Sequence, residues 1–314
     1  MVSNMLPDAA HPERGSFVRD QVAALRRLEG LEVAFYEFGP GARSLAASAR
    51  DLRRRFAGRA GDRFDVVHAH FGLTAWPALA VPTRVRALTV HGTDVRHPRT
   101  RLATRAVLPL IDLLAAVSAE LAAELPGAGP RRAQVLPCGV DIERFRPMSR
   151  AQARAELGLH PERPYLLFAA DPSRPEKRHD RALELARAVD VELLTLGAVE
   201  PSRVPLWINA ANAVLVPSER EGFGLAVLEA LACDVPVLAT PVGIHPDALR
   251  DVDGTLCAPF DLVRWRTAVE PHLRAPPEAD DGRVDGRTSA MRFSAGEMAE
   301  RVVAAWRAVL EGSG

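Results

Sequence analysis

Short apolar runs alternate along this chain with longer stretches in which apolar residues recur at helical spacing. Runs that are apolar throughout, rather than at every second position, are typical of strands buried on both faces of a sheet. The alternation of strands and helices predicts an α/β protein with doubly wound parallel sheets. The predicted strands are Phe64–Val67, Ala87–Val90, Leu113–Val117, Leu166–Ala169, Val191–Leu196, Ala213–Val216 and Pro236–Ala239. The clearest predicted helices are Phe17–Leu28, Leu45–Phe56, Arg178–Val189 and Leu225–Ala232.

Prolines mark the best boundary in this pattern. Pro147, Pro161 and Pro164 interrupt it, and a new strand begins at Tyr165. We therefore predict Rossmann-like domains over residues 1–147 and 148–293, each of ordinary domain size. A second linker, Ala275–Arg287, leads to a last helix over residues 294–314. An apolar stripe on this helix is formed by Met298, Val302, Trp306 and Leu310.

The charge and composition narrow the class of function. The chain has 40 Lys and Arg and 40 Asp and Glu, so no overall charge favours nucleic acid. Residues 1–150 hold 22 Arg against 15 acidic residues, a net charge of +7, and the remainder is correspondingly acidic. This asymmetry fits either a binding surface or two domains that attract each other. No apolar run reaches the ~18 residues of a membrane span, and three widely spaced cysteines indicate a reducing compartment. We expect a cytoplasmic protein without a metal site.

Lysine is nearly absent from the chain. Of the 40 basic residues 39 are arginines, and the remaining one is Lys177. A compact ammonium on a thin stem suits a phosphate approached end-on, a role that the planar guanidinium of arginine fills less well. Composition alone supports chance retention of this lysine at the surface equally well.

The segment Ala213–Thr240 carries the most informative chemistry, because it predicts a strand, a loop, a helix and a strand. Its loop, Glu221-Gly222-Phe223-Gly224, opens the helix, and the two glycines let a ligand approach the backbone closely. The free N–H groups of a first helical turn favour an anionic group such as a phosphate. Glu229, eight residues after Glu221, offers a carboxylate that can accept two hydrogen bonds from a ribose. The alternative is an ordinary buried strand–turn–helix with surface glutamates.

These residues resemble the Glu-x7-Glu signature of glycosyltransferase family 4, the retaining transferases of the GT-B fold. The resemblance covers nearly the whole chain and implies two Rossmann-like domains that face each other across a cleft. It also implies that the last helix crosses back to the N-terminal domain. The matching pieces are Ala69–Gly72, His91–Asp94, Val117-Ser118, Pro137–Asp141, Phe145–Pro147, Pro217-Ser218, Glu221–Leu225, Leu228–Ala230, Pro236-Val237 and Thr240–Gly243.

The resemblance implies a role for each residue of the C-terminal half. Glu229 would hold the ribose, and Glu221 would contact the sugar hydroxyls. Lys177, in Pro175-Glu176-Lys177, is similar to the phosphate-binding lysine of the family, and its charge would stabilise the leaving diphosphate. The backbone near the diphosphate would come from Gly222, Phe223, Gly224 and Leu225.

The loop before the lysine departs from the family pattern. Relatives usually have Gly-Arg five to six residues earlier, where this chain has Asp171 and Pro172. We predict that Arg174 supplies the missing cation in donor binding and that Arg178 begins the next helix.

In the N-terminal half the resemblance implies that His91 contacts the donor sugar or phosphate, although a lone histidine is more often structural. Arg14 and Gly15 would lie in a loop near the phosphates or the acceptor. Asp94 would either join this phosphate loop or cap the next turn. His68, which alternates with buried strand positions, is interpreted as structural.

The implied reaction moves a sugar from a sugar nucleotide to a glycan, a lipid-linked molecule or a small molecule. The configuration would be retained by front-face displacement, with the sugar nucleotide as co-substrate and no further cofactor. Covalent attack by Glu221 is a second possibility. Rival functions are a GT-B epimerase or phosphorylase, and a non-catalytic relative that only binds the sugar nucleotide. A dinucleotide oxidoreductase is disfavoured, because no G-x-G-x-x-G follows a strand.

A cluster of arginines lies between a predicted helix and a predicted strand. One interpretation is peripheral contact with an anionic membrane, at its inner face, that carries a lipid-linked acceptor. A solvated helix face is the simpler one. The cluster consists of Arg53, Arg54, Arg55, Arg59 and Arg63.

Overall fold

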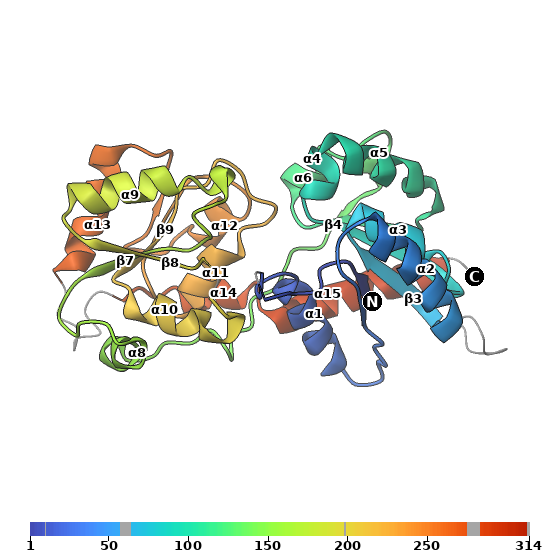
Figure 1. The fold of residues 1–314 in the computed structure, drawn as a ribbon, viewed down its shortest axis with the longest axis horizontal. Helices are drawn as coiled ribbons and strands as arrows, with labels where there is room; N and C mark the ends of the chain where they lie inside the picture. Colours follow the sequence, from blue (N-terminus) through green and yellow to red (C-terminus); the bar gives the residue numbers. More distant parts are fainter. Residues whose placement is uncertain (10, 57–63, 198, 275–282, 313–314) are drawn as a thin grey trace. The chain divides into compact units, whose positions relative to one another are not determined.

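The computed structural model of the protein describes residues 1–9, 11–56, 64–197, 199–274 and 283–312. The chain forms two compact units (Figure 1). The first comprises Met1–Gly139 and Ala295–Gly314, and the second comprises Val140–Ser294. Whereas the prolines place the first boundary after residue 147, residues 140–147 pack with the second unit. Arg287 holds them there, because its guanidinium donates hydrogen bonds to the carbonyls of Ile142 and Phe145.

The first unit is built on a six-stranded parallel sheet with the order β2-β1-β3-β4-β5-β6. Its central strands are β3 (Phe64–His70), β4 (Thr83–Val90) and β5 (Leu113–Ala116), at the predicted positions. The chain runs from β1 outward to β2 and then returns to β3 on the other side of β1. The carboxyl ends of β1 and β3 therefore form a switch point, where ligands of such sheets bind. The outer strands are β1 (Val2–Ser3), β2 (Tyr36–Glu37) and β6 (Gln134–Val135).

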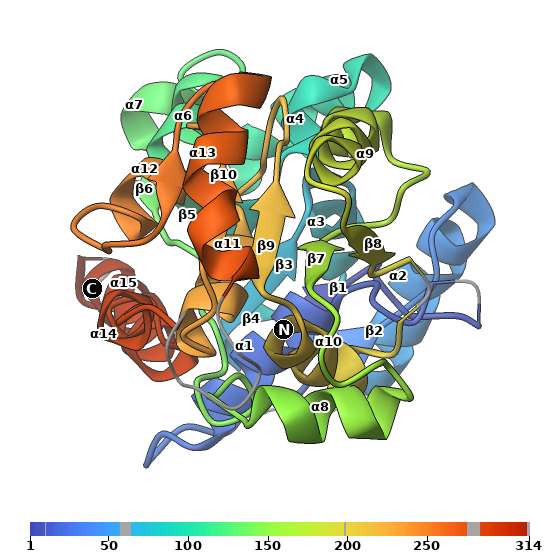
Figure 2. The ribbon, with the colours of Figure 1, turned by 90° about the vertical axis from the view of Figure 1, so that its left-hand side faces the viewer.

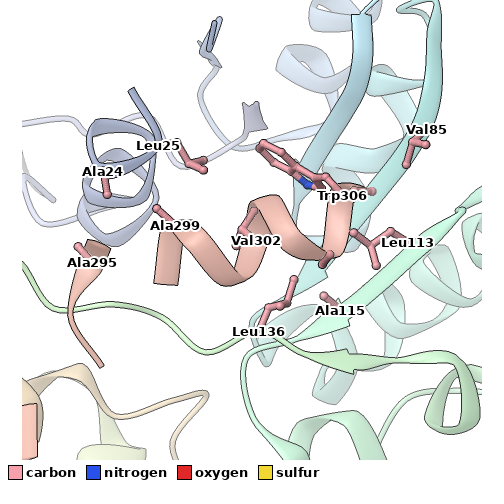
Figure 3. Close-up of a cluster of buried hydrophobic side chains, with 12 residues drawn as sticks. Ala24, Leu25, Val85, Leu113, Ala115, Leu136, Ala295, Ala299, Val302 and Trp306 are labelled. Atoms are coloured by element: carbon pink, nitrogen blue, oxygen red, sulfur yellow. The ribbon is translucent and has the colours of Figure 1, made fainter. Parts of the chain in front are cut away.

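Two helices that lie far apart in the sequence cover β4 and β5 of this sheet (Figure 3). They are α1 (Ser16–Arg26) and α15 (Ala295–Gly312), so the last helix belongs to the first unit. Val302 and Trp306 of α15 are buried against Leu25 of α1 and against the strands. The remaining helices of the unit are α2 (Ala42–Phe56), α3 (Gly72–Ala78), α4 (Thr93–Arg96), α5 (Pro98–Val107), η1 (Leu108–Leu110), α6 (Ala119–Ala123) and α7 (Gly129–Arg132).

The second unit is built on a five-stranded parallel sheet with the order β11-β10-β9-β7-β8 (Figure 2). Its switch point lies between β7 and β9, because the chain goes from β7 to β8 and then to β9 on the opposite side. The two doubly wound parallel sheets confirm the predicted α/β class. The strands are β7 (Tyr165–Phe168), β8 (Glu192–Thr195), β9 (Ala213–Val216), β10 (Val237–Ala239) and β11 (Leu256–Cys257).

Helices cover both faces of the second sheet (Figure 1). On one face α9 (His179–Ala188) and α13 (Leu262–Leu273) enclose a core that includes the fully buried Trp265. On the other face lie α10 (Val204–Ala210) and α11 (Leu225–Ala232), and α11 has the bounds that its apolar pattern predicts. The remaining helices are α8 (Arg150–Leu157), η2 (Pro175–Lys177), η3 (Pro201–Arg203), α12 (His245–Ala248) and α14 (Arg287–Met291).

The arginines of the basic cluster are partly neutralised. Arg54 and Arg55 both form ion pairs with Asp51, at 2.6 and 2.9 Å. Arg59 and Arg63 lie outside the described residues. Within the part of the chain that the structure describes, no helix combines the length and the apolar character needed to cross a membrane.

Truncation of the indole that joins α15 to the sheet should destabilise the protein. We expect Trp306→Ala to lower the free energy of unfolding by about 3–5 kcal/mol, the usual cost of removing a buried aromatic side chain. Urea unfolding followed by circular dichroism measures this loss. The matched control is Val263→Ala at a side chain that is 74% exposed, which should stay within about 0.5 kcal/mol of the wild type. Equal stability of the two variants would contradict the packing of α15.

Candidate active site

Lys177, which the composition singles out, and Glu221, which the glycosyltransferase motif singles out, meet at the switch point of the second sheet. Lys177 ends η2 in the loop that follows β7, and Glu221 lies in the loop that follows β9. The Lys177 ammonium lies 2.7 and 2.6 Å from the two carboxylate oxygens of Glu221. Parallel strands end at the same edge of a sheet, so loops separated by 44 residues of sequence are brought together here.

The environment of Glu221 keeps its carboxyl ionised although it is buried. Burial by itself raises the pKa of this carboxyl, but the Lys177 ammonium, His245 when it is protonated, and hydrogen bonds from Lys177 and Ser218 together lower the pKa below its ordinary value. Ser218 Oγ donates its bond to Glu221 Oε1 at 2.7 Å. Both members of the ion pair are largely shielded, with side chains 14% and 8% exposed. A shielded pair of opposite charges beside a helix start suits a charged ligand.

The helix that follows, α11, begins without a side-chain cap. Gly224 occupies its N-cap position with a φ of 107°, a conformation that L residues with side chains rarely adopt. A Cβ atom on Gly224 would lie 2.5 Å from Nε2 of His245, so only glycine fits there. Gly224 has no side chain with which to cap α11, and the N–H groups of a first helical turn suit an anion.

The remaining predicted donor residues differ in their surroundings. Glu229 is half-buried on α11. The exposed side chain of Arg174 is bound to Glu176 Oε1 through Nε and Nη2, at 3.0 and 2.7 Å. Arg178 precedes α9 directly, with a left-handed backbone, and its guanidinium bonds to Asp180 and Glu219. In the second unit, therefore, Lys177 and Glu221 are in direct contact, whereas Arg174 is engaged with a neighbour on its own loop.

In the first unit His91 follows β4 at the carboxyl edge of the sheet. Three rings surround it: Phe17 of α1, Phe71 after β3 and His70 at the end of β3, with centroids 4.9, 4.7 and 5.1 Å away. Phe71 has a φ of 74° although it is not glycine, a costly conformation that clusters at functional sites. Burial lowers the pKa of His91 to about 3, so its imidazole is neutral at pH 7.

Asp94 accepts hydrogen bonds from the backbone of turns that precede it in the chain. Its Oδ1 accepts the N–H groups of His91 and Gly92 at 3.0 and 2.9 Å, and its Oδ2 accepts that of Gly72 at 3.2 Å. Burial raises the pKa of this carboxyl to about 6, although these backbone bonds oppose the rise. Asp94 thereby joins the turns after β3 and β4, and its two predicted roles, in the phosphate loop or as a cap, stay predictions.

The loop before α1 is closely packed. Gly15 has a φ of 70°, and a Cβ atom there would lie 2.5 Å from the Met5 carbonyl oxygen, so the position requires glycine. Arg14 beside it forms an ion pair with Asp8 at 2.7 Å. These contacts place both residues in the loop between β1 and α1, and their predicted role near the phosphates or the acceptor stays a prediction.

His68 is enclosed within the first unit, as expected of a structural residue. Its Nε2 bonds to Thr89 Oγ1 at 2.7 Å, and its Nδ1 accepts the indole N–H of Trp306 at 3.2 Å. Burial first, and then repulsion from the N-terminal amine and from His91 when those groups are protonated, lower its pKa to about 3.

The residue patterns predicted no role for several residues that shape the two sites. Ser218 stands in the matched Pro217-Ser218 pair, so the motif contained a signal for it. His245 follows Gly243, the last residue of the matched Thr240–Gly243 piece, by two positions, and its close approach to Gly224 has no signal in the sequence. The positive φ of Phe71 has none either, because nothing in a phenylalanine predicts it.

Both halves of the chain match families of known proteins. Residues 7–144 match the family described as Glycosyltransferase Family 4, and residues 160–274 match the family described as Glycosyl transferases group 1. The D-inositol 3-phosphate glycosyltransferase of Segniliparus rotundus is 31% identical, over 85% of this chain and 71% of that protein. D-inositol 3-phosphate glycosyltransferase 1 of Catenulispora acidiphila is 32% identical, over 81% of this chain and 74% of that protein.

Solved structures resemble the fold over nearly the whole chain. Sucrose-phosphate synthase from Thermosynechococcus elongatus has a TM-score of 0.71 at 18% identity and covers 99% of both chains. HepE from Anabaena, in complex with UDP-glucose, has a TM-score of 0.66 at 15% identity and covers 98% of both chains. At such identities the likeness shows the fold alone, and it confirms the predicted GT-B class.

The buried histidines should make stability depend on pH in a defined direction. The folded-state pKa of His68, about 3, lies below the ordinary 6.5, so its stabilising contribution is complete above pH 6.5 and is lost as the pH falls toward 3. In this window the unfolded chain binds one more proton, which makes the free energy of unfolding fall by about 1.4 kcal/mol per pH unit.

We expect His68→Gln to reduce this slope by about that amount between about pH 4 and 6. Urea unfolding at a series of pH values measures the slope. His11→Gln, at an exposed histidine, is the control and should leave the slope unchanged. A wild-type slope in His68→Gln would show that His68 is not neutral in the folded state.

Proposed function

Because this chain belongs to glycosyltransferase family 4, we propose that it transfers the sugar of a UDP-sugar to a hydroxyl group of a small phosphorylated polyol. The chain is a glycosyltransferase; the identity of its substrates and the roles of its site residues are the proposal. The observation that carries the donor side is the shielded Lys177–Glu221 pair immediately before the uncapped start of α11.

On the donor side, Lys177 would bind the diphosphate. A lysine ammonium has three N–H donors, so its contact with one carboxylate leaves a donor for a phosphate oxygen. The partial positive charge at the start of α11 would act on the same diphosphate. Glu229, farther along α11, would accept the ribose hydroxyls. UDP is favoured as the nucleotide because HepE, which shares the fold, is known in complex with UDP-glucose.

The proposed reaction is a displacement on one face of the sugar. The bond from the anomeric carbon to the leaving phosphate oxygen breaks, and a bond to the acceptor oxygen forms on the same face. The acceptor proton goes to the leaving phosphate oxygen, so no separate protein base is needed. Negative charge develops on the diphosphate, and the preorganised Lys177 ammonium would stabilise it. Glu221 would hold that ammonium in place and contact the sugar hydroxyls.

Two observations support a phosphorylated polyol, such as inositol phosphate, as the acceptor. The relatives at 31–32% identity are D-inositol 3-phosphate glycosyltransferases. In addition, the N-terminal half carries a net charge of +7, which favours an anionic partner. Arg14 and Gly15, in the loop before α1, remain the predicted acceptor residues.

The substrates can be identified in two steps. UDP-sugars should raise the midpoint of thermal unfolding, and the rise should grow with concentration above the dissociation constant, whereas GDP- and ADP-sugars should have little effect. With the stabilising donor, D-inositol 3-phosphate should accelerate release of UDP, and unphosphorylated inositol should not.

Stabilisation by GDP- or ADP-sugars alone would refute the donor assignment. Turnover with inositol but not with its phosphate would refute the acceptor assignment. Conversion of the donor without any acceptor would instead indicate an epimerase.

Removal of the lone ammonium should abolish most of the activity. We expect Lys177→Ala to lower kcat/KM for the donor by about a hundredfold or more, the typical cost of losing one group that stabilises developing charge. The control is Arg187→Ala, at an exposed cation on α9, which should keep wild-type turnover. Far-ultraviolet circular dichroism checks that both variants are folded. A folded Lys177→Ala enzyme with wild-type kinetics would exclude the proposed role.

A further inference from the structure

Three histidine rings form a continuous row on one face of the first sheet. His68 and His70 alternate on β3, so they point to the same side, and their rings stack with centroids 4.9 Å apart. His70 in turn stacks on His91, which follows the neighbouring strand β4, at 5.1 Å. The row connects Trp306, on the last helix, with the residue proposed to face the donor.

The proton positions at the inner end of the row follow from one contact. Trp306 donates its indole N–H to His68 Nδ1, and an indole nitrogen cannot accept a hydrogen bond. A neutral His68 must therefore carry its proton on Nε2, from which it donates to Thr89 Oγ1 at 2.7 Å. Burial lowers the pKa of all three histidines far enough for the rings to be neutral at pH 7.

The proton position at the outer end follows from the surroundings of His70. Its Nδ1 lies 2.9 Å from His91 Nε2, so one proton lies between the two neutral rings. His70 Nε2 is buried and has no hydrogen-bond partner among the described residues. If His91 supplied the shared proton, His70 would carry its own proton on that buried nitrogen. A buried N–H without an acceptor is rarer in proteins than an under-satisfied acceptor. The favoured arrangement has His70 Nδ1–H donating to His91 Nε2.

The His91 ring is also held in orientation. Phe17 and Phe71 pack against it, and Asp94 accepts the backbone N–H of His91 at 3.0 Å. Because its Nε2 accepts from His70, a neutral His91 must carry its proton on Nδ1. This nitrogen is then an N–H donor, suited to an oxygen of a sugar or phosphate and unsuited to taking a proton from a hydroxyl group.

We propose that His70 is a positioning residue that holds His91 in the tautomer protonated on Nδ1, so that His91 acts as a hydrogen-bond donor and not as a base. The role in sugar transfer rests on the function proposed above and on the prediction from the sequence that His91 contacts the donor. The tautomer itself does not, because it follows from contacts within the first unit.

Long-range proton–nitrogen correlation spectra of protein labelled with ¹⁵N-histidine test the tautomer directly. The His91 signals are assigned by their loss in His91→Gln. In the wild type without substrate, Nδ1 should appear protonated and Nε2 unprotonated. In His70→Leu this preference should weaken, and kcat/KM for the donor should fall about tenfold, the typical effect of one hydrogen bond. His70→Asn, whose amide can donate from about the position of Nδ1, should restore both readouts.

His68→Leu is the matched control, because it removes a buried ring from the same strand and leaves the bond between His70 and His91. It should retain the His91 tautomer. A wild-type His91 protonated on Nε2, or an unchanged tautomer in folded His70→Leu, would overturn the assignment. The inferred tautomer with unchanged kinetics in His70→Leu would overturn the positioning role alone. Failure of the donor to bind wild-type protein would refute the proposed function while leaving the tautomer result standing.

Discussion

The ion pair between Lys177 and Glu221 is the contact on which the second unit's site depends. Glu221 is 7% exposed, and a carboxylate at that depth is stable only when its charge and its lone pairs are satisfied. Lys177 supplies the opposite charge from the loop after β7, and Ser218 supplies a further hydrogen bond from its own loop. The pair thereby ties together the two loops at the switch point. It also presents an ammonium close in sequence to the start of α11, where the N-cap residue is a glycine and provides no side-chain cap.

A buried carboxylate also organises the first unit, where backbone N–H groups take the place of the ammonium. Asp94 is buried, and its oxygens accept N–H groups from the turns after β3 and β4. Those turns place Phe71 and His91 side by side at the carboxyl edge of the sheet. In both units a buried carboxylate joins the loops of neighbouring parallel strands, which is where α/β sheets bind their ligands.

Much of the fold and part of the candidate site could be predicted from residue patterns. The other features depend on contacts between segments that lie far apart in the sequence. The apolar run of α11 and the glycines before it predicted the helix and its start, because both are local signals. The scarcity of lysine drew attention to Lys177. Its partner could not be derived from spacing, since 44 residues separate it from Glu221. The two-residue strands β2, β6 and β11 are too short to show a period. The boundary at Gly139 depends on hydrogen bonds from Arg287, far along the chain, which no proline signal reports.

Because the chain contains a single lysine, the proposed contact between Lys177 and the diphosphate can be tested on one resonance. Protein labelled with ¹⁵N at the lysine side-chain nitrogen should show one ammonium signal, that of Lys177, which can be followed as UDP is added. We expect the signal to shift in a saturable manner as the ammonium gains a phosphate partner, with a dissociation constant that matches calorimetry. If calorimetry shows that UDP binds and the lysine signal does not change, Lys177 is not a diphosphate ligand and the proposed donor site is wrong.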